Sequence, residues 1–153
     1  MYARILVPID GSSAAQRGLD EAIALARRLG SSLRVLNVAE ADLPDAETPS
    51  TYAPSAQLIE DWRIAGERLV PDAVARARSQ GVSVDGALRC DPTLRVCDVI
   101  VQEATRTAAD LIVMGSHGHR DPTHFALGRN AELVLQTSPV PVLLVRAADM
   151  AGR

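Results

Sequence analysis

The segment ADLIVMGSHG, residues 109–118, joins an unbroken apolar run to two closely spaced glycines. The run Leu111–Met114 has no polar alternation, which is typical of a strand that is buried on both faces. A second run of this kind, ILVPI at residues 5–9, ends directly before Asp10 and Gly11. Because strands buried on both faces belong to parallel sheets with helices on each side, these runs predict an α/β fold.

Helical patterns separate the strand-like runs. Apolar residues recur at helical spacing over residues 19–29, after a capping box predicted at Ser13–Gln16 and before Gly30. A second apolar stripe, residues 58–80, predicts a helix with a kink or break near Pro71, because proline removes a helical hydrogen bond. We expect Trp62 of this stripe to lie in the core.

The alternation continues to the end of the chain. Strands are expected at residues 33–38, 82–88 and 140–145, and Pro141 suits the last of them to a sheet edge. Further helices are expected to begin near Thr93 and to span about Asn130 to Thr137. The acidic, proline-containing loop over residues 41–55 is expected to be mobile without a ligand and to act as a lid.

Composition excludes several classes of protein. The chain of 153 residues is 47% hydrophobic and 23% charged, which fits one globular domain over residues 1–153. Its formal net charge of -3 offers no basic face to nucleic acid or to a membrane. The start MYARILVPID resembles neither a signal peptide nor a membrane span, so a cytoplasmic protein is expected. Cys90 and Cys97 lack metal-ligand spacing and are expected to be reduced packing residues.

The fold class predicts where a ligand binds. Parallel α/β sheets bind ligands beyond the carboxyl ends of their strands, where the strand order reverses. The candidates are therefore Pro8, Ile9 and Asp10 after the first strand and MGSHGHRDPTHFALGRN, residues 114–130, after the fourth.

The glycines of the second segment favour a phosphate ligand. Gly115, Gly118 and Gly128 allow close backbone approach, and the last precedes a helix whose amide groups would point at an anion. Neither a Walker A motif nor the dinucleotide-binding pattern G-x-G-x-x-G is present.

Taken together, these segments resemble the universal stress protein family. The resemblance covers nearly the whole chain and is carried by ILVPIDGS at 5–12, LRVLNV at 33–38, ADLIVMGSHG at 109–118, Gly128 and SPVPVLLVR at 138–146. It implies a Rossmann-like, adenine nucleotide alpha hydrolase-like fold with five parallel strands in the order 3-2-1-4-5. It also implies a homodimer through the last strand, here Val140–Val145. Many members of the family bind ATP, and others bind no nucleotide.

The resemblance also implies the ligand and its residues. An adenine nucleotide, ATP, ADP or AMP, is expected, with Mg²⁺ an open possibility alongside ATP. By position, the adenine and ribose would be surrounded by Pro8, Ile9, Asp10 and Val38. The ribose and phosphates would meet Met114, Gly115, His117, Gly118, Gly128, Arg129 and Asn130.

Arg129 departs from the family pattern. Members that bind ATP usually have Ser or Thr after the last glycine, because a small hydroxyl can contact a phosphate and cap the helix. The Arg129 guanidinium could pair with a phosphate instead, while Asn130 could take over the capping role. Alternatively, Arg129 is an ordinary surface residue.

Each candidate also has an interpretation without a ligand. Asp10 could cap the following helix, and the glycines could simply form turns. His117, His119 and His124 are more typical of solvated loop residues than of metal ligands. Three functions stay open: a nucleotide-binding sensor or regulator, a slow ATP hydrolase or phosphotransferase in which Asp10 holds a divalent cation, and a nucleotide-free dimeric interaction module.

Overall fold

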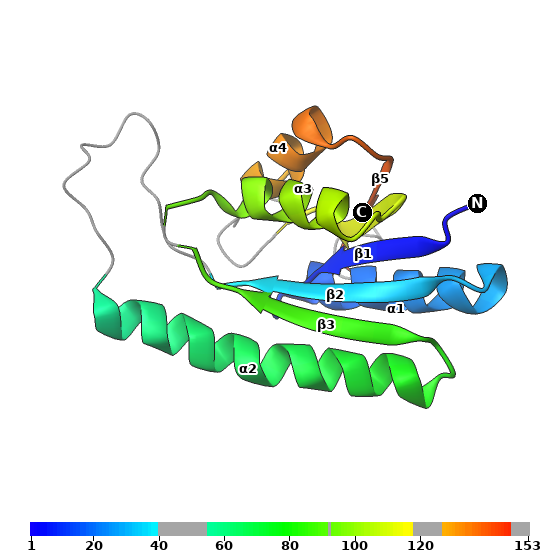
Figure 1. Ribbon diagram of the computed structural model, residues 1–153, viewed down its shortest axis with the longest axis horizontal. Coiled ribbons are helices and arrows are strands. Elements are labelled where there is room, and N and C mark those ends of the chain that lie inside the picture. The colour runs from blue at the N-terminus through cyan, green and yellow to red at the C-terminus, as the bar shows by residue number, and fades with distance from the viewer. Residues whose placement is uncertain (40–54, 92, 118–126, 148–153) are drawn as a thin grey trace.

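The computed structural model describes residues 1–39, 55–91, 93–117 and 127–147 (Figure 1). Five parallel strands form one sheet in the order β3-β2-β1-β4-β5, which confirms the strand order implied by the resemblance. The strands are β1 (Arg4–Pro8), β2 (Ser32–Val38), β3 (Val84–Arg89), β4 (Leu111–Gly115) and β5 (Val142–Val145). The helices are α1 (Ser13–Leu29), α2 (Ala56–Ser79), α3 (Val96–Arg106) and α4 (Arg129–Thr137).

Helices cover both faces of the sheet because successive strand residues point to opposite sides. Ile5 and Val7 of β1 belong to the core cluster that includes α1 and α2, whereas Leu6 belongs to the cluster that includes α3 and α4. Figure 1 shows these two helix pairs on opposite sides of the sheet. Both clusters are apolar, which explains why the central strands lack polar alternation.

The start of α1 differs by one residue from the prediction. Ser12, and not Ser13, is the N-cap, and its hydroxyl oxygen accepts the amide N–H of Ala15 at 3.2 Å. The third helical residue is therefore Ala15, whose methyl group cannot complete a capping box. The helix ends as expected at Gly30, whose φ of 72° places it in the left-handed region.

The predicted break at Pro71 is wrong, since α2 runs through this residue from Ala56 to Ser79. Ala73 and Ala77, just after the proline, pack in the core and hold that half of the helix against the sheet. The start of α2 extends past the carboxyl ends of β2 and β3 (Figure 1). Trp62 of α2 is half-buried instead of lying in the core.

The expectations for the two cysteines and for α3 are corrected in part. Both cysteines are free thiols; Cys97 is buried as expected, but Cys90 is exposed. Helix α3 begins at Val96 and not near Thr93, because the Asp91 carboxylate holds the Thr93 amide at 2.9 Å and its hydroxyl at 2.6 Å in a turn. No helix in the described ranges is long and apolar enough to cross a membrane. The proposed lid, residues 41–55, falls almost entirely outside the described residues.

Candidate functional site

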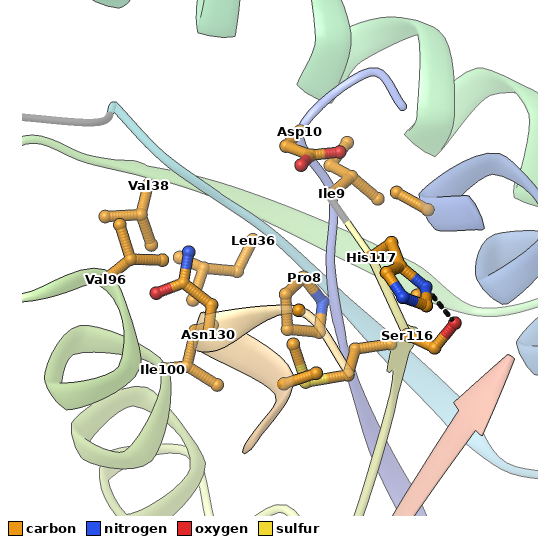
Figure 2. A pocket seen from close by; sticks show the side chains of 15 residues that line it. Pro8, Ile9, Asp10, Leu36, Val38, Val96, Ile100, Ser116, His117 and Asn130 are labelled. Atoms are coloured by element: carbon orange, nitrogen blue, oxygen red, sulfur yellow. Dashed lines mark hydrogen bonds between the residues drawn. The ribbon is translucent and has the colours of Figure 1, made fainter. Parts of the chain in front are cut away.

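A pocket lies at the carboxyl ends of β1, β2 and β4, where the topology predicted it (Figure 2). Its volume is about 560 Å³, including the space at its open mouth. It brings together most of the predicted ligand-binding residues: Pro8, Ile9, Asp10, Val38, Met114, Gly115, His117, Gly128 and Asn130.

Two predicted residues stand apart from this set. Arg129 is exposed and does not line the pocket, and Gly118 falls outside the described residues. The expectation that Asn130 caps α4 is wrong, because Gly128 is the N-cap and Asn130 is the second helical residue. Gly128 has no side chain with which to cap this helix.

One side of the pocket is apolar. Leu36 and Val38 of β2 face Val96 and Ile100 of α3, as Figure 2 shows. Leu36 precedes Val38 by two residues on the same strand face, and Val96 and Ile100 share one helix face. Sequence reasoning missed the lining residues Ala15, Leu36, Val96, Ile100 and Ala131, whereas Ser116 belongs to the candidate segment 114–130. For Leu36, Val96 and Ile100 the only signal in the sequence was the spacing of apolar residues on one strand face and one helix face, which is equally typical of core packing.

The other side of the pocket is polar. The Asp10 carboxylate accepts the Ser12 amide N–H at 2.9 Å, so Asp10 braces the turn before α1, while Ser12 caps the helix. Ser116 Oγ lies 2.9 Å from His117 Nδ1 (Figure 2), and the Ser12 hydroxyl donates to the His117 carbonyl at 3.5 Å. The segment after β1 and the segment after β4 are thus hydrogen-bonded to each other beside the same opening.

Backbone hydrogen bonds fix the start of α4 at the pocket. Ser116 donates its amide N–H to the Val145 carbonyl at 2.9 Å, and its own carbonyl accepts the Gly128 amide at 2.8 Å. The N-terminus of α4 therefore stands at the pocket edge, where Gly128, Asn130 and Ala131 line the wall. The positive end of a helix dipole favours an anion at such a place.

Metal ligands do not gather in the part of the chain that the structure describes: no group of three His, Cys, Asp or Glu side chains is found there. Of the three histidines considered as ligands, His117 lies at the pocket, and His119 and His124 lie outside the described residues.

Comparison with known proteins identifies the family. A sequence profile of the Universal stress protein family matches residues 1–146. The chain belongs to this family. A universal stress protein of Thermus aquaticus is 32% identical over 149 residues, which cover 95% of this chain and 100% of the relative.

Solved structures of universal stress proteins agree with this fold. One from Burkholderia pseudomallei is 33% identical, with a TM-score of 0.72 and coverage of 94% of this chain and 96% of that one. Another, the universal stress protein from Archaeoglobus fulgidus in complex with dAMP, is 25% identical, with a TM-score of 0.67 and coverage of 94% and 98%.

Proposed function

We propose that this universal stress protein binds an adenine nucleotide in the pocket at the carboxyl ends of β1, β2 and β4. The observation that carries the proposal is the pairing, in one pocket, of an apolar wall with a helix N-terminus. A nucleotide has the same two parts, because a flat base prefers apolar surroundings and a phosphate prefers backbone amides.

The base would lie between β2 and α3. Leu36 and Val38 offer an aliphatic surface from the sheet, and Val96 and Ile100 offer another from the helix. The relative from Archaeoglobus fulgidus whose structure contains dAMP supports an adenine base for a member of this family.

The sugar and phosphates would lie toward Asp10 and the start of α4. The Asp10 carboxylate, already oriented by the Ser12 amide, is suited to accept a hydrogen bond from a ribose hydroxyl. Gly128 allows the phosphates to approach the backbone, and the dipole of α4 favours their charge. We infer that ATP is bound in this way, with Asp10 available to a divalent cation that accompanies it.

We also propose that nucleotide binding serves a cytoplasmic sensing or regulatory role. Slow hydrolysis or phosphoryl transfer is the competing function at the same site. An assay for ADP release from bound ATP separates the two, because a sensor returns ATP intact.

The binding proposal is tested with Val96→Asp. Val96 is the first residue of α3, where an aspartate is compatible with the helix dipole, so the fold should be retained. A carboxylate beside the base should weaken adenosine, AMP and ATP alike, by about 10-fold or more, because the charge must be desolvated. The control is Ile64→Asp on α2, which changes a side chain that is 43% exposed and does not line the pocket. Unchanged affinity in Val96→Asp would place the nucleotide elsewhere.

A further inference from the structure

Asn37 is a buried polar residue on the face of β2 that is turned away from the ligand pocket. It lies between Leu36 and Val38, which both line the pocket, but its own side chain points to the α2 side, where it meets Gly66. Its residue exposure is only 5%. A buried amide destabilises a fold unless it is hydrogen-bonded, so its partner is informative.

The hydrogen-bond partner of Asn37 is Ile9, which lines the pocket and directly precedes Asp10. Asn37 Nδ2 donates to the Ile9 carbonyl oxygen at 2.8 Å, and the Ile9 amide donates to the Leu36 carbonyl at 2.8 Å. The regular pairing of β1 with β2 ends one residue earlier, at Pro8. Both backbone groups of Ile9 are thus held by β2: the amide by the backbone of Leu36 and the carbonyl by the side chain of Asn37.

The segment that follows Ile9 depends on this anchor. Asp10 comes next, then Gly11 with a φ of +84°, and then Ser12, the N-cap of α1. Loss of the Asn37 hydrogen bond would leave the Ile9 carbonyl without that donor and allow the Asp10 turn to move.

Gly66 of α2 makes room for the Asn37 amide. A Cβ on Gly66 would overlap Asn37 Oδ1 and the side chain of Leu88. Since Asn37 Oδ1 is at the end of a side chain, Gly66→Ala would displace the amide without an obligatory shift of the backbone. Gly66 itself does not line the pocket.

We propose that Asn37 is a positioning residue for the ligand pocket: its amide, admitted by Gly66, holds the Ile9 carbonyl and thereby places Asp10, and it links α2 to the bound nucleotide. The part of this inference that concerns affinity rests on the proposed function. The part that concerns the Ile9–Ser12 segment does not.

The first test needs no ligand. Amide hydrogen exchange at Ile9 and Ser12 is measured by NMR in Asn37→Ala, in Gly66→Ala and in the matched control Gly86→Ala. A Cβ on Gly86 would overlap Val70 of α2, which disturbs the packing of the same helix without touching Asn37. We expect faster exchange at both amides in the first two variants and not in the control. Equal protection at Ile9 and Ser12 in Asn37→Ala and the wild type would overturn the proposal.

The second test measures ATP affinity by calorimetry. Loss of one hydrogen bond that positions the site should weaken ATP by roughly 3- to 10-fold in Asn37→Ala, and Gly66→Ala should act in the same direction. In the double variant Asn37→Ala/Gly66→Ala, the second substitution should weaken ATP no further, because the Asn37 amide that it would displace is already absent. Gly86→Ala should bind as the wild type does. Additive losses, or an equal loss in Gly86→Ala, would contradict the link through Asn37. A wild type that binds no adenine nucleotide would instead overturn the proposed function, and the exchange rates would still decide the role of Asn37.

Discussion

Gly115, at the end of β4, lies against Ala14 in the first turn of α1. A Cβ on Gly115 would be 2.7 Å from the Ala14 carbonyl carbon and 2.8 Å from the Ala15 amide nitrogen. These are backbone atoms, which cannot move aside as the end of a side chain can. The glycine therefore sets how closely α1 approaches the sheet beside the pocket.

Gly115→Ala should lower the free energy of unfolding by about 1–3 kcal/mol, because overpacking forces the start of α1 away from β4. Urea denaturation measures the change. The control is Gly81→Ala, where the added Cβ meets nothing within 4 Å and only the positive φ of 81° is unfavourable, at a cost of about 1 kcal/mol. A Gly115→Ala variant as stable as the wild type would show that α1 can shift freely.

Glu103 of α3 is fully buried and is held by three arginines. Its carboxylate oxygens accept hydrogen bonds from Arg34 at 2.9 Å, Arg89 at 2.9 Å and Arg106 at 3.0 Å. Burial alone would raise the pKa of Glu103, but the hydrogen bonds from Arg106 and Arg34 outweigh it and hold the pKa below its ordinary value.

Glu103→Gln should therefore destabilise the protein at pH 7, by about 2–3 kcal/mol, because three arginines lose their shared charge partner. A carboxylate with a lowered pKa in the folded state stabilises above its unfolded pKa, about 4.3, and loses this contribution as pH falls toward the folded value. The difference in the free energy of unfolding between the wild type and Glu103→Gln should therefore decrease from pH 5 to pH 3, as measured by urea denaturation at each pH. Glu67→Gln, which removes an exposed carboxylate from an ion pair on α2, should cost less than about 0.5 kcal/mol. A difference in unfolding free energy that increases at acid pH would contradict this account.

The edge strand β5 predicts a dimer. In the described part of the sheet β5 pairs only with β4, and Leu143 is 40% exposed. An apolar edge strand invites pairing, and a symmetric partner over Val140–Val145 would cover it. Light scattering at micromolar concentration should give the mass of a dimer, and Leu143→Lys should shift it toward the monomer. A monomeric wild type would contradict the prediction.

Arg129→Ala tests the residue at which the family pattern changes. Its side chain is exposed at the first turn of α4, so its charge should act on a phosphate through solvent more than through a buried contact. We expect ATP to bind about 2- to 5-fold more weakly in the variant, with AMP nearly unchanged and the difference reduced by salt. Equal ATP affinities in wild type and variant at low salt would remove Arg129 from the site.

The fold could be predicted because fully buried strands leave unbroken apolar runs, and Gly30 marked a helix end. The cap of α1 was misplaced because Ser12 and Ser13 are adjacent and equally good capping residues. The half-burial of Trp62 depends on how α2 packs against the sheet, which is a tertiary property that a helical stripe does not contain.

The site was predictable where glycine and Asp10 follow a strand, because the topology assigns those positions to the ligand side. The apolar wall was not predictable in the same way. Leu36, Val96 and Ile100 have the residue type and spacing of core positions, and only the structure separates lining from packing. Asn37 was missed because its partner, the Ile9 carbonyl, is a backbone group with no sequence signature.

The most direct measurement is a calorimetric titration of ATP into nucleotide-depleted wild-type protein, with GTP as the reference ligand. The account predicts saturable one-to-one binding of ATP that competes with AMP and is weakened in Val96→Asp. The absence of any saturable heat with ATP, ADP or AMP up to millimolar concentration would contradict it, and it would leave the nucleotide-free interaction module as the function of this chain.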